Sequence, residues 1–564
     1  MKFQDFTYER PDFSVFEVKF KELLERFKEA DSFASQDNSM EAIVGLRSGL
    51  ESMEAIARIR HSVDTTDEFY KAEQEFFDEI EPLYQGLITD FYRALIGSAF
   101  REDLETKWGK QLFRIASLSL KTFSPDIVDD LVQENKLASE YSKLLASAKL
   151  VYAGEERNLS QLVPFQLSTD RNVRKESNDV KYSFFIEHEA KLDELYDQLV
   201  HIRTAIAKKL GYNNFVELAY ARMNRSDYTA KDVEAFRNQV LEHIVPAASK
   251  LKERQKARIG VEALHYYDDK FGFPSGNATP QGDADWIVEQ AAKMYAELSP
   301  ETDEFFTFMQ DNGLMDLVAK KGKRVGGYCS YISTYQAPFI FSNFNGTSGD
   351  IDVLTHEVGH AFQGYSSREF KVPEYVFPTL EACEIHSMSM EFLAWPWMSL
   401  FFKEETDKYK FKHLSESLLF IPYGVAVDEF QHRVYEQPEL TPAERKLVWR
   451  EIERKYLPHR VYEDNDYLER GGFWQQQPHI YKSPFYYIDY TLAQVCAFQF
   501  WKRANEDSEL AWQDYLRLCR QGGSLSFTEL VQVADLISPF EDGCVASVIG
   551  EIEGWLDQID DKKL

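Results

Sequence analysis

Residues 356–360 read His-Glu-Val-Gly-His, a pattern that carries the residue types of a metal-dependent hydrolase. Two histidines four residues apart on a helix lie on one face, one turn apart, so both imidazoles can reach the same metal ion. Glu357 is rotated by about 100° from His356 and can hold a water molecule beside the metal without binding the ion. The spacing therefore predicts that His356 and His360 bind zinc and that Glu357 is the general base.

A third ligand is required, because hydrolytic zinc sites use three protein ligands and leave the fourth position to water. The segment after Thr379 is expected to form a helix on which Glu384 and Glu391 share one stripe with Leu380 and Met388. Carboxylates on an otherwise apolar stripe are costly unless a cation or hydrogen-bond donors meet them. We expect Glu384 to be the third zinc ligand and Glu391 to support one of the ligands by a hydrogen bond without binding the metal itself.

Neighbouring polar residues have more ordinary interpretations. Glu381 falls in the first turn of the expected helix, where a negative charge favours the helix dipole. Cys383 and His386 are rotated away from the stripe and are expected to be structural. Gln363 lies one turn after His360, where either a supporting role in the site or an exposed surface amide fits the pattern.

A second cluster combines one histidine with several tyrosines near the C-terminus. Tyr481, Tyr486, Tyr487 and Tyr490 follow closely on His479. Phenol and imidazole N–H donors beside a zinc ion are what a tetrahedral oxyanion needs. The alternative from these residues alone is an aromatic helix core, since the chain contains 30 tyrosines.

The motif H-E-x-G-H, followed by E-x-x-S-x-x-x-E over residues 384–391, resembles the thimet oligopeptidase and oligoendopeptidase F family of zinc endopeptidases. The likeness is strongest to its bacillus-type Pz-peptidase branch. Residues 222–229, 326–329 and 479–490 also resemble segments of that family, and the likeness is specific from about residue 219 to residue 500.

The chain departs from the mammalian branch of this family in two places. Residues 361–383, which separate His360 from Glu384, number 23, one fewer than in that branch, so the connecting loop must differ. Gln363 stands where that branch has a third histidine, which leaves its role open.

The resemblance implies one zinc ion per chain and a deep channel between two helical lobes that admits oligopeptides and excludes folded proteins. It also favours His479 and Tyr490, with Tyr487, as donors to the transition state. A short strand after Gly326 would then hold the substrate by backbone pairing, which gives affinity without demanding a particular sequence.

The elements that position these residues are predicted to be mainly helical. Residues 178–210 show apolar residues at three- and four-residue steps and are expected to form one helix that Gly211 ends, and Thr229 is expected to start another. The zinc helix is expected to begin at Ser348 or Asp350 and to stop near Gly364.

A small sheet is expected before the zinc helix. Residues 326–335 and 339–344 are rich in β-branched and aromatic types and are expected to form strands, and residues 345–346 read Asn-Gly, which favours a turn. Pro338 precedes the second strand, and because proline is confined to strand edges it predicts at least one exposed edge.

Composition excludes several classes of protein. The 564 residues include 94 Asp and Glu against 64 Lys and Arg, a net charge of −30, which argues against binding nucleic acid or anionic membranes and favours basic or neutral peptides. Five scattered cysteines without a C-x-x-C pair suit a reducing compartment. No secretory leader and no run of 18 apolar residues is present, so we expect a cytoplasmic protein without a membrane span.

The sequence thus predicts a mainly α protein with two helical lobes around a deep channel and a small sheet beside the zinc helix. The lobes are expected to be residues 1–210 and a catalytic region of residues 211–564. The predicted function is zinc-dependent hydrolysis of internal bonds in oligopeptides. Two alternatives stay open: a zinc carboxypeptidase, and a non-catalytic helical peptide-binding protein whose motif is accidental.

Overall fold

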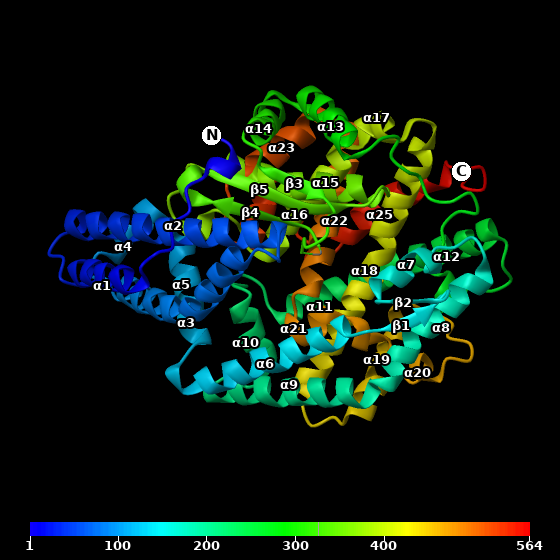
Figure 1. Ribbon diagram of the computed structural model, residues 1–564, viewed down its shortest axis with the longest axis horizontal. Coiled ribbons are helices and arrows are strands. Elements are labelled where there is room, and N and C mark those ends of the chain that lie inside the picture. The colour runs from blue at the N-terminus through cyan, green and yellow to red at the C-terminus, as the bar shows by residue number, and fades with distance from the viewer. Residues whose placement is uncertain (325) are drawn as a thin grey trace.

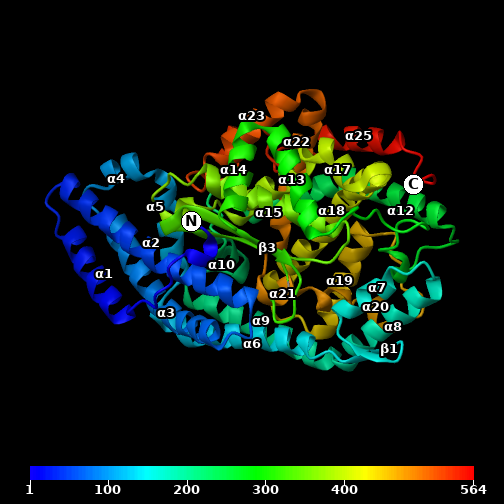
Figure 2. The ribbon, with the colours of Figure 1, turned by 45° about the horizontal axis from the view of Figure 1, so that its top comes forward.

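Helices make up most of residues 1–324 and 326–564, the part of the chain that this computed structural model describes, which confirms the mainly α prediction (Figure 1). The first five helices pack together as a layer at one end of the molecule (Figure 2). They are α1 (Phe13–Lys28), α2 (Phe33–Val63), α3 (Glu68–Ile96), α4 (Arg101–Trp108) and α5 (Lys110–Thr122).

This N-terminal layer, α1–α5, has an apolar cluster of its own. Phe20, Phe27, Phe77 and Phe91 are among its fully buried members, and Tyr375 enters it from the second half of the chain. Aromatic residues on α1 recur at three- and four-residue steps, so one face of that helix is apolar and packs against α2 and α3.

The remaining helices surround a second and larger core. Those of the middle part are α6 (Val128–Ala146), α7 (Val163–Gln166), α8 (Arg171–Glu187), α9 (Glu189–Lys209), α10 (Phe215–Arg222), α11 (Ala230–Gln239), α12 (Val245–Ile259), α13 (Ala284–Leu298) and α14 (Pro300–Asp311). Those of the last part are α15 (Gly349–Ser366), α16 (Leu380–Leu393), α17 (Ser399–Phe402), α18 (Thr406–Glu436), α19 (Pro442–Tyr456), α20 (Asp466–Glu469), α21 (Pro478–Lys482), α22 (Tyr487–Glu506), α23 (Ser508–Cys519), α24 (Phe527–Val533) and α25 (Cys544–Asp557).

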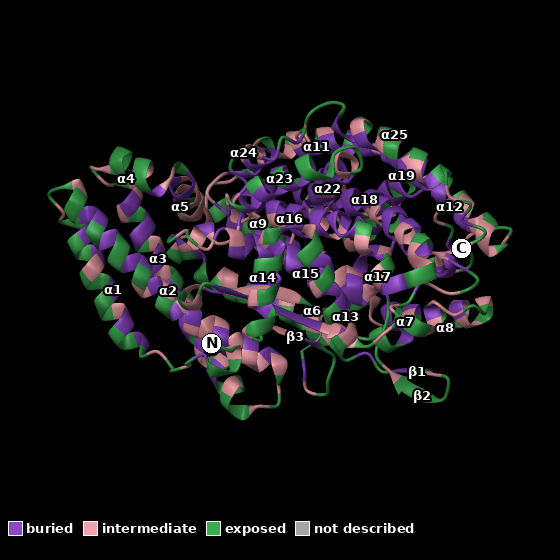
Figure 3. Cartoon of the chain, turned by 90° about the horizontal axis from the view of Figure 1, so that it is seen from above, coloured by how far each residue is buried: buried purple, intermediate pink, exposed green. Residues whose placement is uncertain are grey.

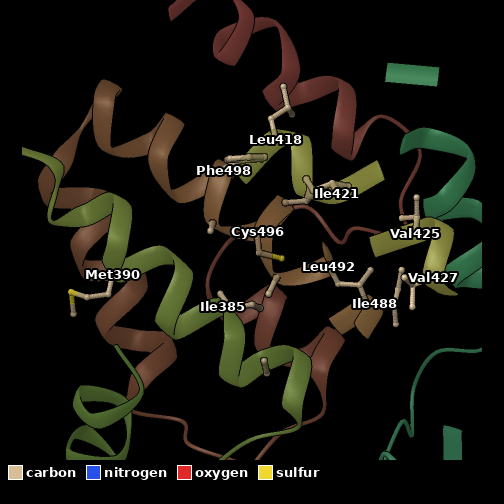
Figure 4. Close-up of a cluster of buried hydrophobic side chains, with 14 of the residues drawn as sticks. Ile385, Met390, Leu418, Ile421, Val425, Val427, Ile488, Leu492, Cys496 and Phe498 are labelled. Carbon is tan, nitrogen blue, oxygen red and sulfur yellow. The ribbon is translucent and has the colours of Figure 1, made fainter. Parts of the chain in front are cut away.

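Helices α16, α18 and α22 lie at the centre of this core and are buried along most of their length (Figure 3). Ile385, Leu418, Ile421, Leu492 and Cys496 come from these three helices and meet in one cluster (Figure 4). Residues 491–501 of α22 are all buried, so this part of the helix shows no exposed polar stripe.

Two glycines allow these helices to approach closely. A Cβ at Gly359 of α15 would lie 2.6 Å from the carbonyl oxygen of His386 on α16, and one at Gly424 of α18 would lie 2.2 Å from the side chain of Thr491 on α22. The central glycine of the H-E-x-G-H motif is therefore a packing residue, because it lets α16 lie directly against the histidine-bearing helix.

The predicted small sheet is present beside α15. Its strands are β3 (Met315–Val318), β4 (Tyr328–Ile332) and β5 (Ala337–Phe344), in the order β3-β5-β4, with β3 parallel and β4 antiparallel to β5. A separate hairpin joins β1 (Leu150–Tyr152) and β2 (Glu155–Arg157). Within the described residues β4 has a strand neighbour on one side only.

Pro338 predicted at least one exposed edge, and among the described residues the sheet has one at β4, although the proline itself is on another strand. Pro338 belongs to β5, the middle strand, and lies opposite Tyr331 of β4. Pairing between β3 and β5 begins only at Ile340, so the proline lies where β5 has one neighbour. The proline is tolerated there because the ladder on its other side has not yet started.

Three predicted helix boundaries can be compared with those of the structure. Residues 178–210 do not form one helix: α8 ends and α9 begins at His188, whose Nδ1 lies 2.9 Å from the carbonyl oxygen of Phe184. Helix α15 passes through Gly364 and ends at Ser366, because the chain packs against the ring of Tyr331 at that glycine instead of turning. Thr229 does cap α11, as predicted.

No described helix combines the length and the apolar character needed to cross a lipid bilayer. The division of the chain at residue 210 and the deep channel between the lobes stay predictions.

Candidate metal centre and catalytic groups

Helices α15 and α16 bring His356, His360 and Glu384 together at the centre of the molecule. His356 Nε2 lies 3.3 Å and His360 Nε2 lies 3.7 Å from Glu384 Oε2. Two ligand atoms of a tetrahedral zinc ion bound at about 2.1 Å lie roughly 3.4 Å apart. The three side chains therefore fit a zinc ion by both chemistry and spacing.

The charges of two of these groups suit metal binding. Burial lowers the pKa of His360 to about 4, so its imidazole is neutral and keeps a lone pair. Burial alone would raise the pKa of Glu384, but the adjacent imidazoles of His356 and His360 and the hydroxyl of Ser387 outweigh it and lower that pKa to about 2. Glu384 is thus ionised throughout the neutral range.

A chain of hydrogen bonds fixes His356 from behind. Trp395 Nε1–H donates to His413 Nδ1 over 3.2 Å, so the proton of His413 lies on Nε2, which donates to Glu391 Oε2 over 2.8 Å. The other oxygen of Glu391 lies 2.7 Å from His356 Nδ1. His356 Nδ1 is therefore the donor, and its Nε2 presents a lone pair towards Glu384.

Glu357 is buried beside this group. Its Oε2 has no hydrogen-bond partner among the described residues, an arrangement that a water molecule would complete. Burial raises the pKa of Glu357 to about 7. A Cβ at Gly327 would lie 3.3 Å from Glu357 Oε1, so the chain entering β4 passes directly over this carboxylate.

The tyrosines of the second cluster do not all lie together. Tyr486 donates its hydroxyl to Glu384 Oε1 over 3.1 Å, and its ring centroid lies 5.0 Å from that of Tyr490. The rings of Tyr487 and Tyr490 are 4.8 and 6.0 Å from that of His479. These four side chains therefore border the metal ligands from the α21–α22 side.

Tyr481 lies elsewhere. It is fully buried and stacks on Tyr141 of α6 at 3.9 Å between ring centroids. For this tyrosine the aromatic core was the better interpretation.

The protonation of His479 follows from its neighbours. Tyr423 donates its hydroxyl to Gln477 Oε1, which leaves the Nε2 amide of Gln477 to face His479 Nδ1 at 2.7 Å. Nδ1 accepts, so the single ring proton of a neutral His479 lies on Nε2. Burial lowers the pKa of His479 to about 4, which keeps the ring neutral and leaves Nε2–H as a donor.

The turn that precedes α22 is strained. Phe485 has φ of +68°, a left-handed conformation that is rare for an aromatic residue. Its N–H donates to Gln431, and its carbonyl accepts from Arg225, which also pairs with Asp489 in the first turn of α22. These bonds hold the backbone that aims Tyr486 at Glu384.

Comparisons with known proteins identify the family of the chain. Residues 165–548 match peptidase family M3, and residues 3–123 match the peptidase M3 N-terminal domain. The chain belongs to peptidase family M3. A solved structure of Pz peptidase A with an inhibitor is 64% identical, covers all of both chains and gives a TM-score of 0.94. A putative oligoendopeptidase F from Bacillus anthracis is 59% identical over 100% of this chain and 99% of that one, with a TM-score of 0.89.

More distant relatives are also found for this family M3 chain. The group B oligopeptidase PepB of Streptococcus agalactiae is 24% identical over 408 residues. That alignment spans 67% of this chain and 64% of the streptococcal protein, somewhat less than two thirds of it.

Two other residues of the M3 chain differ from their sequence interpretation, and a third agrees with it. Gln363 is neither exposed nor directed at the metal ligands: it is buried and donates to the carbonyl of Val376, holding the loop between α15 and α16. Glu381 lies in the first turn as expected, yet it is buried and accepts a hydrogen bond from Tyr228, so it does more than favour the helix dipole. His386 is fully buried, as a structural residue should be.

Two functional contacts were missed by sequence reasoning. His413 comes from α18, far from the motif in sequence, and no local pattern marks it. Tyr486 was noticed in the cluster but not selected. Its spacing of four residues from Tyr490 was the available signal, because such a pair shares one helix face.

Proposed function

We propose that this family M3 protein is a zinc-dependent endopeptidase that hydrolyses internal bonds of oligopeptides. The observation that carries the proposal is the placement of His356, His360 and Glu384 at the mutual distances of a tetrahedral zinc site, with Glu357 beside them. The relatives named oligopeptidase and oligoendopeptidase F support the choice of substrate class.

When bound by these three residues, one zinc ion per chain supplies a Lewis acid that acidifies water and polarises a carbonyl group. Glu357 Oε2 takes a proton from the attacking water and delivers it to the nitrogen of the leaving amine. The pKa of about 7 that burial gives this carboxyl suits both steps, because it can accept and release a proton near neutral pH.

The donors on α21 and α22 act on the charge that develops on the substrate carbonyl oxygen. His479 Nε2–H and the hydroxyl of Tyr490 are the principal donors, with Tyr487 beside them. Burial raises the pKa of Tyr490 to about 12, so its proton is retained at working pH. Tyr486 has a different task, since its hydroxyl holds Glu384 in place.

The substrate is placed along β4, in the channel between the two lobes. This strand has one free edge among the described residues, and the chain just before it passes over Glu357. Backbone pairing along a strand edge binds many sequences with similar strength, as an enzyme for varied oligopeptides requires.

The test uses peptides blocked at both ends, cleaved with and without a chelator and analysed by mass spectrometry. An endopeptidase cleaves them internally and loses activity with the chelator, whereas a carboxypeptidase leaves them intact. Glu357→Gln should lower kcat by roughly 10³ while zinc stays bound. Glu416→Gln, at an exposed position on α18, is the matched control.

Substantial cleavage by the Glu357→Gln variant would refute the assignment of the base. About one zinc per chain in the purified protein supports the enzyme, and a chain that takes up no zinc would favour the non-catalytic peptide-binding alternative.

A further inference from the structure

A pocket of about 370 Å³ lies beyond the C-terminal end of α16, between α22, α23 and α25. Five of the nine tryptophans of the chain line it: Trp395, Trp397, Trp501, Trp512 and Trp555. Its volume lies within the range of sites for small organic molecules. We call it the tryptophan pocket.

The walls of the tryptophan pocket are fixed by packing. The Trp395 ring lies 6.1 Å from that of Trp501 and 5.4 Å from that of Trp555, in edge and tilted arrangements. Trp397 donates its Nε1–H to Glu297, which holds it at the rim. The chamber therefore offers aromatic faces and edges that are already in place for a flat apolar group.

One cation faces this chamber without a partner. Lys410 of α18 lines the pocket with its Nζ 5.7 Å from the centre of the Trp395 ring. It makes no ion pair or hydrogen bond to any residue that the structure describes, whereas Lys408 and Lys412 on the same helix pair with Glu405 and Glu416. Burial lowers the pKa of Lys410. An anion beside it would relieve that cost.

A side chain of the opposite charge also lines the pocket. Glu509 of α23 and Asn505 of α22 are both exposed lining residues. The pocket thus presents an aromatic chamber, one unpaired ammonium group and one carboxylate. A molecule that matches all three has a flat apolar side chain, a carboxylate and an ammonium group.

We propose that the tryptophan pocket binds a free aromatic amino acid. Its ring lies among the tryptophans, its carboxylate accepts hydrogen bonds from Lys410, and its ammonium group lies towards Glu509. This proposal concerns binding alone and stands whether or not the protein is an endopeptidase.

The test is calorimetric titration of the whole protein with L-phenylalanine. Wild type should bind about one molecule per chain in a saturable way. Lys410→Met should weaken binding about tenfold or more, because a charge-assisted hydrogen bond is lost. Lys412→Met removes a neighbouring surface charge and should leave the affinity unchanged. L-phenylalanine amide, which lacks the carboxylate, should bind wild type as weakly as L-phenylalanine binds Lys410→Met.

A second variant tests the chamber itself. Ala504→Leu places a larger side chain in the pocket wall and should abolish binding, while unchanged peptide cleavage and circular dichroism report an intact fold. Equal affinity in wild type and Lys410→Met, or saturable binding that survives Ala504→Leu, would place the ligand elsewhere and overturn the proposal. Absence of saturable binding to wild type would overturn it as well.

Discussion

The N-terminal layer and the body that carries the metal ligands are held together in different ways. Around α15, α16, α18 and α22 the apolar core is continuous, and buried polar groups inside it pair with one another, as in the hydrogen-bond chain that ends on His356 and in the ion pair of Arg225 with Asp489. The layer α1–α5 has its own apolar cluster. Apolar packing is non-directional and tolerant, so each part can be stable by itself while their relative position is set by other contacts.

Those other contacts include directional ones, beside the apolar packing of Val372 and Tyr375 in the cluster of the layer. Arg47 pairs with Glu374 over 2.8 Å, and Tyr92 donates to the same carboxylate. Arg114 of α5 pairs with Glu529 of α24. The comparison therefore teaches that the chemistry rests in a rigidly packed region, whereas the layer is docked in part by a few charged and hydrogen-bonded contacts whose loss should leave the metal site intact.

The largest effect is expected from a residue in the body that carries the metal ligands, and it concerns the catalytic rate alone. Tyr490→Phe should lower kcat by roughly 10² because one donor to the oxyanion is lost, while zinc affinity and melting temperature stay close to those of wild type. Steady-state kinetics on a blocked peptide measure this. Tyr365→Phe, at the C-terminal end of α15, removes a hydroxyl bonded to Glu304 and is the control. A wild-type kcat in Tyr490→Phe would remove this residue from the mechanism.

The next effect concerns metal affinity. Glu391→Gln should weaken zinc binding about 10- to 100-fold, because the carboxylate that orients His356 and strengthens its lone pair is gone. Competition with a zinc chelator of known affinity measures the change. His413→Gln should act in the same direction and less strongly, since it leaves Glu391 ionised. Unchanged zinc affinity in both variants would show that this chain of hydrogen bonds is only structural.

A smaller effect is expected where the N-terminal layer, α1–α5, contacts the body that carries the metal ligands. Glu374→Gln removes the closer charge partner of the buried Arg47 guanidinium and leaves the more distant Glu51, at 3.5 Å, so it should destabilise docking of the layer by about 3 kcal/mol or less. Limited proteolysis should then cleave residues 1–123 faster, and zinc affinity should not change. If the variant lost zinc and layer docking together, the two regions would be one cooperative unit and the comparison would fail.

The smallest effect is the pH dependence of the stability that the Arg114–Glu529 pair contributes. The Arg114 guanidinium lowers the pKa of Glu529 to about 2, below the value of about 4.3 for an unfolded glutamate. The pair therefore adds stability above pH 4.3, and this contribution is lost as the pH falls towards 2. The difference in melting temperature between wild type and Glu529→Gln should be small and constant from pH 7 to 5, and should shrink below pH 4.5. A difference that grows on acidification would contradict this account.

What could be predicted from the sequence was local. The spacing of His356 and His360 follows helix periodicity, and the carboxylate stripe singled out Glu384 on a second helix; the packing of α16 on α15 brings the three together. The break at His188 could not be seen, because no Gly or Pro interrupts the apolar pattern there. His413 could not be found either, since its contact with Glu391 depends on how α18 packs on α16, which no local pattern encodes.

The same limit applies to Pro338, which predicted an exposed edge but not which strand has it. Proline marks a place without a ladder partner, yet the sequence does not say whether the strand is at an edge or extends beyond a shorter neighbour. The register of β3 against β5, which begins at Ile340, decides the matter and is a property of the assembled sheet.

Helix α22 has a mechanical consequence. It carries Tyr490 near its first turn and Trp501 eleven residues later, roughly 16 Å away along the axis at 1.5 Å per residue. Helices α16, α18, α23 and α25 pack against α22, so it cannot bend without disturbing all of them. A displacement at the Trp501 end is therefore transmitted to the Tyr490 end as a movement of the whole helix along its axis.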